Sequence, residues 1–222
     1  MPELKGSPRQ GLIGAIIGFF VGFAAVALFG SSAARFREVM GLNPVEVGFL
    51  VAMPALSGSL LRIPFAAWVD TSGGRKPFLV LLLLSLAGMG GLAAVVTFLY
   101  PDNLTGGYYP LLLVLALLSG CGIAVFSVGA SQVAYWHPKE RQGVALALFG
   151  GIGNLAPGLF SMLIPIALVT IGLAWSYIGW LGLLLAGTIA YWFLGANSWY
   201  FQLREQGMSV EDAKRIAQAR GQ

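Results

Sequence analysis

Six long apolar segments constrain this chain more than any other feature of its sequence. Each is about twenty residues or longer and holds few charged side chains, which is the length that a helix needs to cross a hydrocarbon layer about 30 Å thick. Of the 222 residues, 57% are hydrophobic and only 10% are charged, whereas soluble domains carry about 25% charged residues. The sequence therefore predicts an all-α membrane protein with six transmembrane helices.

Polar connections and proline residues set the limits of the predicted spans. Pro44 and Pro77 follow glycine-containing connections and are suited to open helices, since the first helical position needs no N–H. A polar lead over residues 1–10 precedes the bundle, and a polar tail over residues 197–222 follows it, with Ser209 expected to cap a short helix. We expect the bundle over residues 11–196, with spans at about 11–39, 45–70, 77–100, 109–134, 142–170 and 174–196.

Basic residues are distributed unevenly between the two sides of the predicted bundle. Only Arg35 and Arg37 fall on one side, and by the positive-inside rule the richer side is cytoplasmic. Both termini are then cytoplasmic in a multi-pass protein of the cell (inner or plasma) membrane. Because these residues are dispersed at span ends, no nucleic-acid partner is expected despite the net charge of +4. The richer side holds Lys5, Arg9, Arg75, Lys76, Lys139, Arg141, Arg204, Lys214, Arg215 and Arg220.

Arg62 is the one charged residue inside the second span. Counting back from Asp70, about eight residues at 1.5 Å each place its backbone roughly 12 Å inside the membrane edge. A charge at such depth costs about 2.5–3.5 kcal/mol on insertion scales, so it should face the bundle interior or a wet cavity and pair with a negative group. Every Asp and Glu near the membrane sits at the end of a span. The missing partner is therefore predicted to be an anionic ligand.

A structural role for Arg62 is the alternative. Pro64 has no N–H and leaves the Leu60 carbonyl without its helical donor, and a guanidinium is able to donate to such a carbonyl. The planar fork of guanidinium donors also suits a planar oxyanion, which favours the ligand hypothesis.

Small residues recur every four positions on two adjoining rows of the fifth span, and such rows let another backbone approach closely. Packing alone explains each glycine taken singly. Asn154 adds an amide to the same face, and Pro157 frees the Gly153 carbonyl beside it, so this face is a candidate lining for a polar pathway. In a 3+3 inverted repeat Arg62 and Asn154 occupy the middle helices, within combined reach if those helices are adjacent. The rows are Gly143-Ala147-Gly151 and Gly150-Asn154-Gly158.

The connection between spans two and three resembles the cytoplasmic loop signature of the major facilitator superfamily. Ala66 stands where that signature usually begins with glycine, and Thr71 replaces the usual arginine. The resemblance implies half of a major-facilitator-type transporter, with this loop gating its conformational change. The matching residues are Asp70, Gly73, Gly74, Arg75 and Lys76.

Two further runs resemble the nitrate/nitrite porter family more specifically. They are GSLLRIP at 58–64 and GIGN at 151–154, although Ala156 stands where many members have another glycine. The resemblance implies that Arg62 is the anion clamp and that Phe126 packs against the planar anion. It also implies that Gly151 and Gly153 are close-approach glycines and that Asn154 is a polar contact. The likeness covers nearly the whole chain but only the amino-terminal half of the family's length, and a second substrate arginine comes from the other half.

We therefore expect secondary active transport of nitrate or nitrite by alternating access, completed by a second six-span half that is a separate chain or another copy. The alternatives are a half-transporter for another small anion or organic acid, and a non-transporting membrane subunit or remnant. No enzyme activity, cofactor or metal is expected, because the spans hold no nucleophile–base pair and His137 has no second ligand nearby. Without a mid-span carboxylate, proton symport needs groups from the other half, whereas anion exchange needs none.

Overall fold

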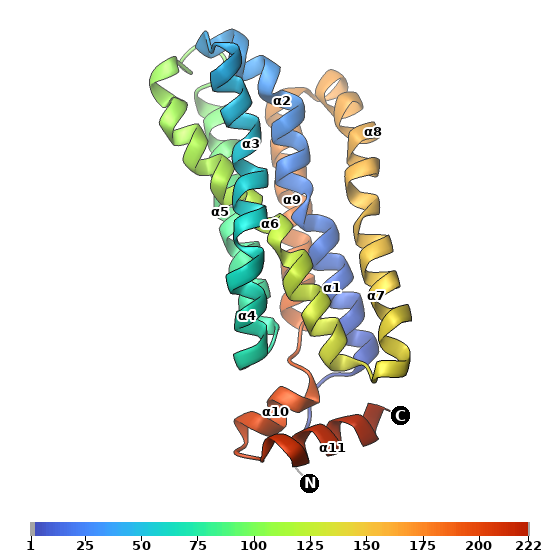
Figure 1. The fold of residues 1–222 in the computed structure, drawn as a ribbon. Helices are drawn as coiled ribbons and strands as arrows, with labels where there is room; N and C mark the ends of the chain where they lie inside the picture. Colours follow the sequence, from blue (N-terminus) through green and yellow to red (C-terminus); the bar gives the residue numbers. More distant parts are fainter. Residues whose placement is uncertain (1–2, 222) are drawn as a thin grey trace.

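Six candidate membrane spans pack side by side in the computed structural model, which describes residues 3–221 (Figure 1). All regular structure in that part of the chain is helical, which confirms the predicted all-α class with six transmembrane helices. The spans run over Pro8–Met40, Pro44–Ser72, Arg75–Phe98, Gly106–Trp136, Lys139–Thr170 and Gly172–Leu194.

Three of the spans are each divided into two helices, a feature that the sequence analysis did not predict. The breaks fall at Phe23, Leu61 and Asn154. Pro64 and Pro157 each follow a break by three residues, and a proline ring clashes with the carbonyl four positions earlier. The divided helices are α1 (Pro8–Gly22) and α2 (Ala24–Met40), α3 (Pro44–Leu60) and α4 (Arg62–Ser72), and α7 (Lys139–Gly153) and α8 (Leu155–Thr170).

The remaining spans are α5 (Arg75–Phe98), α6 (Tyr109–Trp136, preceded by the short 3-10 helix η1 over Gly106–Tyr108) and α9 (Gly172–Leu194). Pro44 opens α3 as predicted, and Asn43 caps it by accepting hydrogen bonds from the Val45 and Glu46 amides at 2.9 and 3.0 Å. By contrast α5 begins at Arg75, two residues before Pro77.

Helix α6 lies at the centre of the bundle and packs against α1, α3, α4, α5 and α7. Its glycines allow this crowding: a Cβ on Gly120 would overlap the Pro54 carbonyl of α3 and one on Gly122 would lie 2.5 Å from the Gly22 carbonyl of α1. Small residues at membrane helix interfaces permit such backbone approach. The core is thus built around α6 by close helix contact.

Spans two and five are the least buried. In their most apolar stretches only 17% and 22% of the residues are buried, against 50–56% in spans one, three and four. The exposed side chains are large and apolar; Ile63 of α4 and Val169 of α8 are 81% and 84% exposed. Both spans therefore present an apolar surface outward, with α6 between α4 and α7 (Figure 1).

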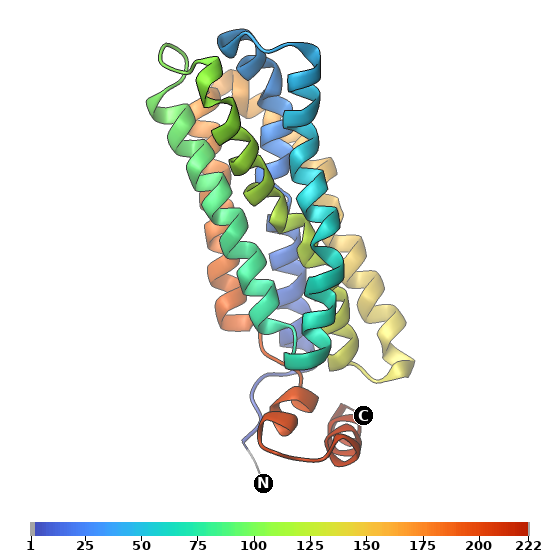
Figure 2. The same ribbon diagram turned by 60° about the vertical axis from the view of Figure 1, so that its left-hand side comes forward.

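Two short helices, α10 (Trp199–Glu205) and α11 (Val210–Gly221), lie beneath one end of the bundle (Figures 1 and 2). The Lys5 amide donates to Gln202 Oε1 and Gln202 Nε2 donates back to the Lys5 carbonyl, both at 2.8 Å. The predicted Ser209 cap is present, since the Asp212 amide donates to Ser209 Oγ at 3.1 Å. We call the end of the bundle that faces α10 and α11 the α11 end.

The close contact at α6 gives a stability prediction. Gly120→Leu should lower the free energy of unfolding by about 1–3 kcal/mol, because the new side chain overlaps α3. Gly90→Leu is the matched control on α5, where a Cβ meets no atom within 4 Å. Thermal unfolding of the purified chain in detergent measures both, and equal midpoints for the two variants would refute the packing account.

Candidate anion-binding site

Arg62 is the first residue of α4, directly after the break at Leu61. Its half-buried side chain lies against α6, with Cζ 5.6 Å from the centroid of the Phe126 ring. Its Nε is buried without a partner, and over residues 3–221 no hydrogen bond or ion pair to the guanidinium is found. The carbonyl contacts that the structural alternative requires are thus missing from the described chain, and the cation is available to a ligand.

The backbone of Arg62 is tied to α6. Ser127 Oγ lies 3.3 Å from the Arg62 carbonyl oxygen and 3.0 Å from the Ala124 carbonyl of its own helix, so its proton is shared between two acceptors. Ser127 thus binds the start of α4 next to the residue that carries the ring. The contact fixes the position of Arg62 relative to Phe126.

Phe126 is supported from behind by a cluster of aromatic rings. The Phe19 ring of α1 lies 5.2 Å from the rings of Phe23, Phe126 and Phe149, and Phe126 lies 5.9 Å from Phe149. Ring separations of 4.5–7 Å are favourable for aromatic pairs. Phe19 and Phe149 are buried while Phe126 is partly exposed, so the cluster holds Phe126 at its edge beside Arg62.

Gly153 makes this arrangement possible. A Cβ on Gly153 would overlap the Phe19 ring, so the glycine provides the space in which Phe19 sits. Gly151 differs, because a Cβ there meets no atom of the described chain within 4 Å. Gly153 therefore packs inside this bundle, while Gly151 belongs to the open face.

The small-residue rows of the fifth span lie on that open face. A Cβ at each of four glycines meets no atom within 4 Å over residues 3–221, so no helix of the described chain makes the predicted close approach to them. These glycines are Gly143, Gly150, Gly151 and Gly158.

Asn154 lies at the break between α7 and α8, exposed on the surface. Its Nδ2 donates to the Gly150 carbonyl at 2.8 Å. The sequence analysis placed Asn154 within combined reach of Arg62 if their helices were adjacent. Helix α6 packs against both helices and lies between them, and within residues 3–221 no hydrogen bond joins the Arg62 and Asn154 side chains. The structure therefore brings Arg62 together with Phe126 but not with Asn154.

The signature loop between α4 and α5 lies at the α11 end. Gly73 has φ +83°, and a Cβ there would lie 2.5 Å from the Asn197 side chain. Likewise, a Cβ on Gly74 would lie 2.7 Å from the Gln132 side chain. Both glycines are needed, one for its left-handed backbone and both for the space they leave to neighbouring side chains.

Two residues that sequence reasoning missed hold this loop. Asn197 Oδ1 accepts a hydrogen bond from the Arg75 amide at 3.0 Å, and Asn197 Nδ2 donates to the Ser72 carbonyl at 3.1 Å. Tyr135 of α6 donates to Asp70 Oδ1 at 3.0 Å. Asn197 follows the end of α9 and Tyr135 lies near the end of α6, and this position was the only feature of the sequence that could have predicted a contact with the loop.

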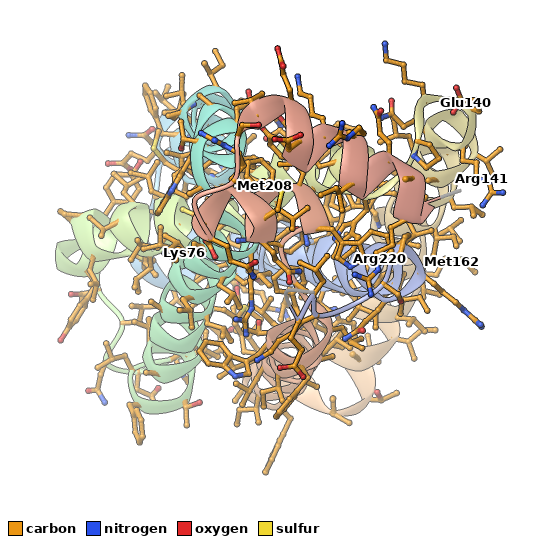
Figure 3. The ribbon with its side chains drawn as sticks, turned by 90° about the horizontal axis from the view of Figure 1, so that it is seen from below. Lys76, Glu140, Arg141, Met162, Met208 and Arg220 are labelled. Atoms are coloured by element: carbon orange, nitrogen blue, oxygen red, sulfur yellow. The ribbon has the colours of Figure 1, made fainter. Side chains whose placement is uncertain are left out.

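The loop cations differ in their surroundings. Arg75 Nη2 donates to the Trp192 carbonyl at 3.0 Å, and its Cζ lies 5.3 Å from the Trp192 ring centroid, whereas Lys76 is exposed (Figure 3). Arg75 thereby joins the loop to α9, the last span.

No metal or cofactor site stands out in the described chain. Within residues 3–221 no three His, Cys, Asp or Glu side chains gather as ligands. His137 Nδ1 lies 2.8 Å from the Val133 carbonyl, and Cys121 Sγ lies 3.6 Å from the Leu117 carbonyl. Both side chains therefore interact with their own helix.

A family model described as the Major Facilitator Superfamily matches residues 14–214, most of the chain. The chain belongs to the major facilitator superfamily. The signature loop and its glycines are thus those of a superfamily member.

Curated relatives narrow the comparison. The chain is 27% identical over 214 residues to the nitrate/nitrite transporter NarU of Salmonella typhimurium, covering 85% of this chain and 44% of that protein. It is 32% identical over 163 residues to the probable nitrate/nitrite antiporter NarK1 of Thermus thermophilus (73% and 34%), and 27% identical over 151 residues to a nitrite extrusion protein of Bacillus subtilis (68% and 35%). The resemblance to nitrate/nitrite porters is confirmed, and the chain spans less than half the length of these relatives.

Two of the three breaks in this superfamily member fall in corresponding helices. Six-helix halves of such transporters contain two inverted three-helix repeats, and interrupted helices at matching positions of the repeats point to the substrate site. Span two, broken at Leu61, and span five, broken at Asn154, are the middle helices of the two repeats.

The two glycines of the GIGN run should respond differently to substitution. Gly153→Ala should destabilise the chain by about 1–3 kcal/mol because its methyl group overlaps Phe19, while Gly151→Ala should change stability by less than about 0.5 kcal/mol. Unfolding midpoints in detergent decide the matter. A Gly153→Ala variant as stable as Gly151→Ala would show that Phe19 is not held as described.

Proposed function

We propose that this chain is one half of a secondary transporter that moves nitrate or nitrite by alternating access, with Arg62 as its anion-binding residue. The named activities of the relatives support the substrate class. The observation that carries the proposal is the Arg62 guanidinium, partly buried in a membrane span and without a partner in residues 3–221.

The energetics of that cation favour an anion as its partner. A charged side chain deep in a span is retained where it faces a cavity or a counter-charge, and here no carboxylate of the described chain supplies one. Nε and a terminal nitrogen of a guanidinium form a flat fork that donates two parallel hydrogen bonds to an oxyanion. The centroid of the Phe126 ring lies 5.6 Å from Arg62 Cζ, so a planar anion bound in this fork would lie beside the ring.

The other proposed site residues contribute by position. Asn154 uses one amide hydrogen for the Gly150 carbonyl and keeps a second for a ligand. Gly151, open and without a side chain, leaves room for the second half to close over the anion. Gly153 acts indirectly, by seating Phe19 behind Phe126.

The second half is proposed to cover the open face of spans two and five. It is a separate six-span chain or a second copy, and it would bring another cation to the site. The α11 end, rich in Lys and Arg, is assigned to the cytoplasm by the positive-inside rule, which places both termini there. The bundle is then a multi-pass unit of the inner or plasma membrane.

Alternating access follows from rocking of one half against the other around a fixed midplane site. On the cytoplasmic side, the loop at Asp70 and Arg75 is held by Tyr135 and Asn197, so these bonds are proposed to gate that movement. Anion exchange requires no titratable group at depth, and within residues 3–221 this half places none beside Arg62.

Substitution of Arg62 tests the proposal. Nitrate should raise the unfolding midpoint of the purified chain, and Arg62→Gln should abolish that rise because the oxyanion loses its donors. Arg37→Gln is the matched control, an exposed arginine at the end of α2. Uptake by cells that express the chain with its partner should be lost in Arg62→Lys, whose ammonium lacks the planar fork. Retained uptake in that variant would contradict the proposal.

The ring beside Arg62 gives a graded test. Phe126→Leu should raise the nitrate concentration for half-maximal stabilisation by about 2-fold to 30-fold, the range of a cation–π contact of about 0.5–2 kcal/mol. Phe126→Tyr keeps the aromatic face and should bind normally. Competition by nitrite, chloride and formate in the same assay separates a nitrate/nitrite site from one for other small anions; equal competition by chloride would favour the broader class.

A further inference from the structure

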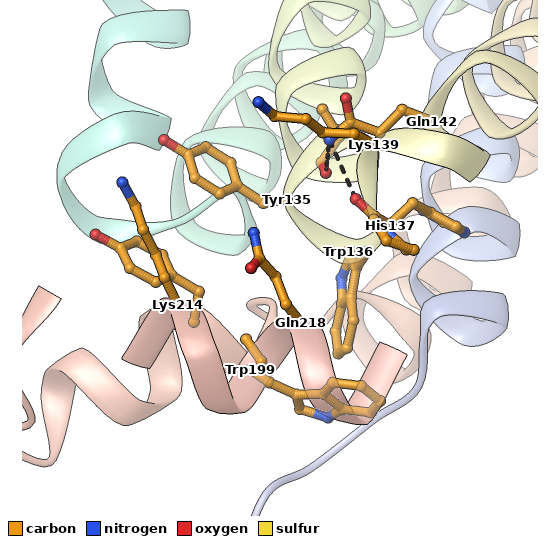
Figure 4. Close-up of a pocket in the computed structure, with 12 residues that line it drawn as sticks. Tyr135, Trp136, His137, Lys139, Gln142, Trp199, Lys214 and Gln218 are labelled. Atoms are coloured by element: carbon orange, nitrogen blue, oxygen red, sulfur yellow. Dashed lines mark hydrogen bonds between the residues drawn. The ribbon is translucent and has the colours of Figure 1, made fainter. Parts of the chain in front are cut away.

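A cavity lies at the α11 end, apart from the Arg62 site. It has a volume of about 370 Å³ and is enclosed by the end of α6, the start of α7 and the helices α10 and α11 (Figure 4). Of its lining residues only Tyr135 takes part in the proposed transport cycle, through its bond to Asp70. Its lining combines aromatic rings with cations, and this combination carries the inference.

The aromatic side chains form two of the cavity's walls. Trp136 at the end of α6 meets Trp199 of α10 edge-on, with ring centroids 5.4 Å apart. Tyr135 stacks on Tyr200 at 5.8 Å. Trp and Tyr are enriched where a membrane protein meets the lipid headgroups, so the cavity has the composition of that layer.

The charged residues that line the cavity are both lysines. Lys139 opens α7 and Lys214 comes from α11, and no Asp or Glu is among the lining residues. Over residues 3–221 neither ammonium forms an ion pair or a hydrogen bond. Asp70, which accepts from the lining residue Tyr135 at 3.0 Å, and Glu140, which follows Lys139 in the chain, are both outside the lining. The cavity is therefore electropositive.

Of the two glutamine side chains that line the cavity, one has its amide hydrogen-bonded within the chain and the other does not. Gln142 Nε2 donates to the Ala134 and His137 carbonyls at 2.9 and 3.1 Å and is occupied. The Gln218 amide has no partner in the described chain and extends from α11 between Lys139 and Lys214 (Figure 4). Helix α7 also begins here with Pro138 as its cap and no side-chain capping bond, so its first N–H groups add positive potential.

We propose that this cavity binds a phosphate group, carried by an anionic lipid headgroup or present as free phosphate. The Lys139 ammonium of α7, and the Lys214 ammonium and Gln218 amide of α11, provide donors for phosphate oxygens. Basic residues beside the membrane attract anionic lipids. The aromatic walls suit the apolar part of a lipid. The inference is independent of nitrate transport.

Thermal unfolding of the full chain in neutral detergent tests this. Added phosphatidylglycerol should raise the midpoint by about 2–4 °C, and phosphatidylcholine should not. The double variant Lys139→Gln/Lys214→Gln should lose this rise. Lys5→Gln/Arg141→Gln removes the same charge outside the cavity, Arg141 pointing away from α11 (Figure 3), and should keep it.

A second variant and a second probe complete the test. Ala217→Phe fills the cavity without changing charge and should also abolish the rise, which covers the case of a misfolded lysine variant. Protection by millimolar inorganic phosphate equal to that by phosphatidylglycerol assigns the site to free phosphate, and protection by the lipid alone assigns it to a headgroup. Equal protection of cavity and control variants, or none in the native chain, overturns the proposal. Nitrate protection should persist in the cavity variants.

Discussion

The structure depends on one constraint: in a hydrocarbon layer every backbone N–H and C=O must find a partner within the protein. The constraint makes six apolar segments into six helices and makes each proline inside a span costly. Polar side chains inside the spans likewise find their partners among main-chain carbonyls. Ser57 Oγ approaches the Pro54 and Leu117 carbonyls at 3.1 and 2.6 Å, and Asn154 Nδ2 donates to the Gly150 carbonyl at 2.8 Å. Broken helices and polar side chains occur together in spans two and five.

This coupling explains why packing and the candidate site share residues. Gly153 lies far from Arg62 in sequence, yet its missing side chain is what lets Phe19 reach the aromatic cluster. Phe19 supports Phe126, and Phe126 faces Arg62. Gly153 therefore reaches Arg62 only indirectly, by making room for Phe19, which contacts Phe126. Its neighbour Gly151 is open on the surface. Two glycines of one motif have separate physical roles.

The length and hydrophobicity of the segments were enough to predict six spans, and the isolated charge of Arg62 was enough to single it out. Resemblance alone singled out Phe126, as a ring packed against the anion, and its 5.6 Å contact with Arg62 comes from the structure. Helix order was harder: nothing local revealed that α6 lies between the helices of Arg62 and Asn154. The Asn197 bonds to the loop join residues more than a hundred positions apart, and only the tertiary fold creates them.

The case for a protein neighbour over spans two and five comes from polar atoms more than from apolar area. Exposed Ile63 and Val169 are compatible with lipid. Fifth-span Asn154 is exposed, and the glycines beside it leave a groove along the helix. Neither feature favours contact with lipid, because lipid cannot form hydrogen bonds with the free groups of an amide and packs poorly into a groove. Another helix satisfies both requirements by donating polar contacts and filling the groove. The open face of spans two and five is therefore the one on which the proposed second half would complete the proposed anion site.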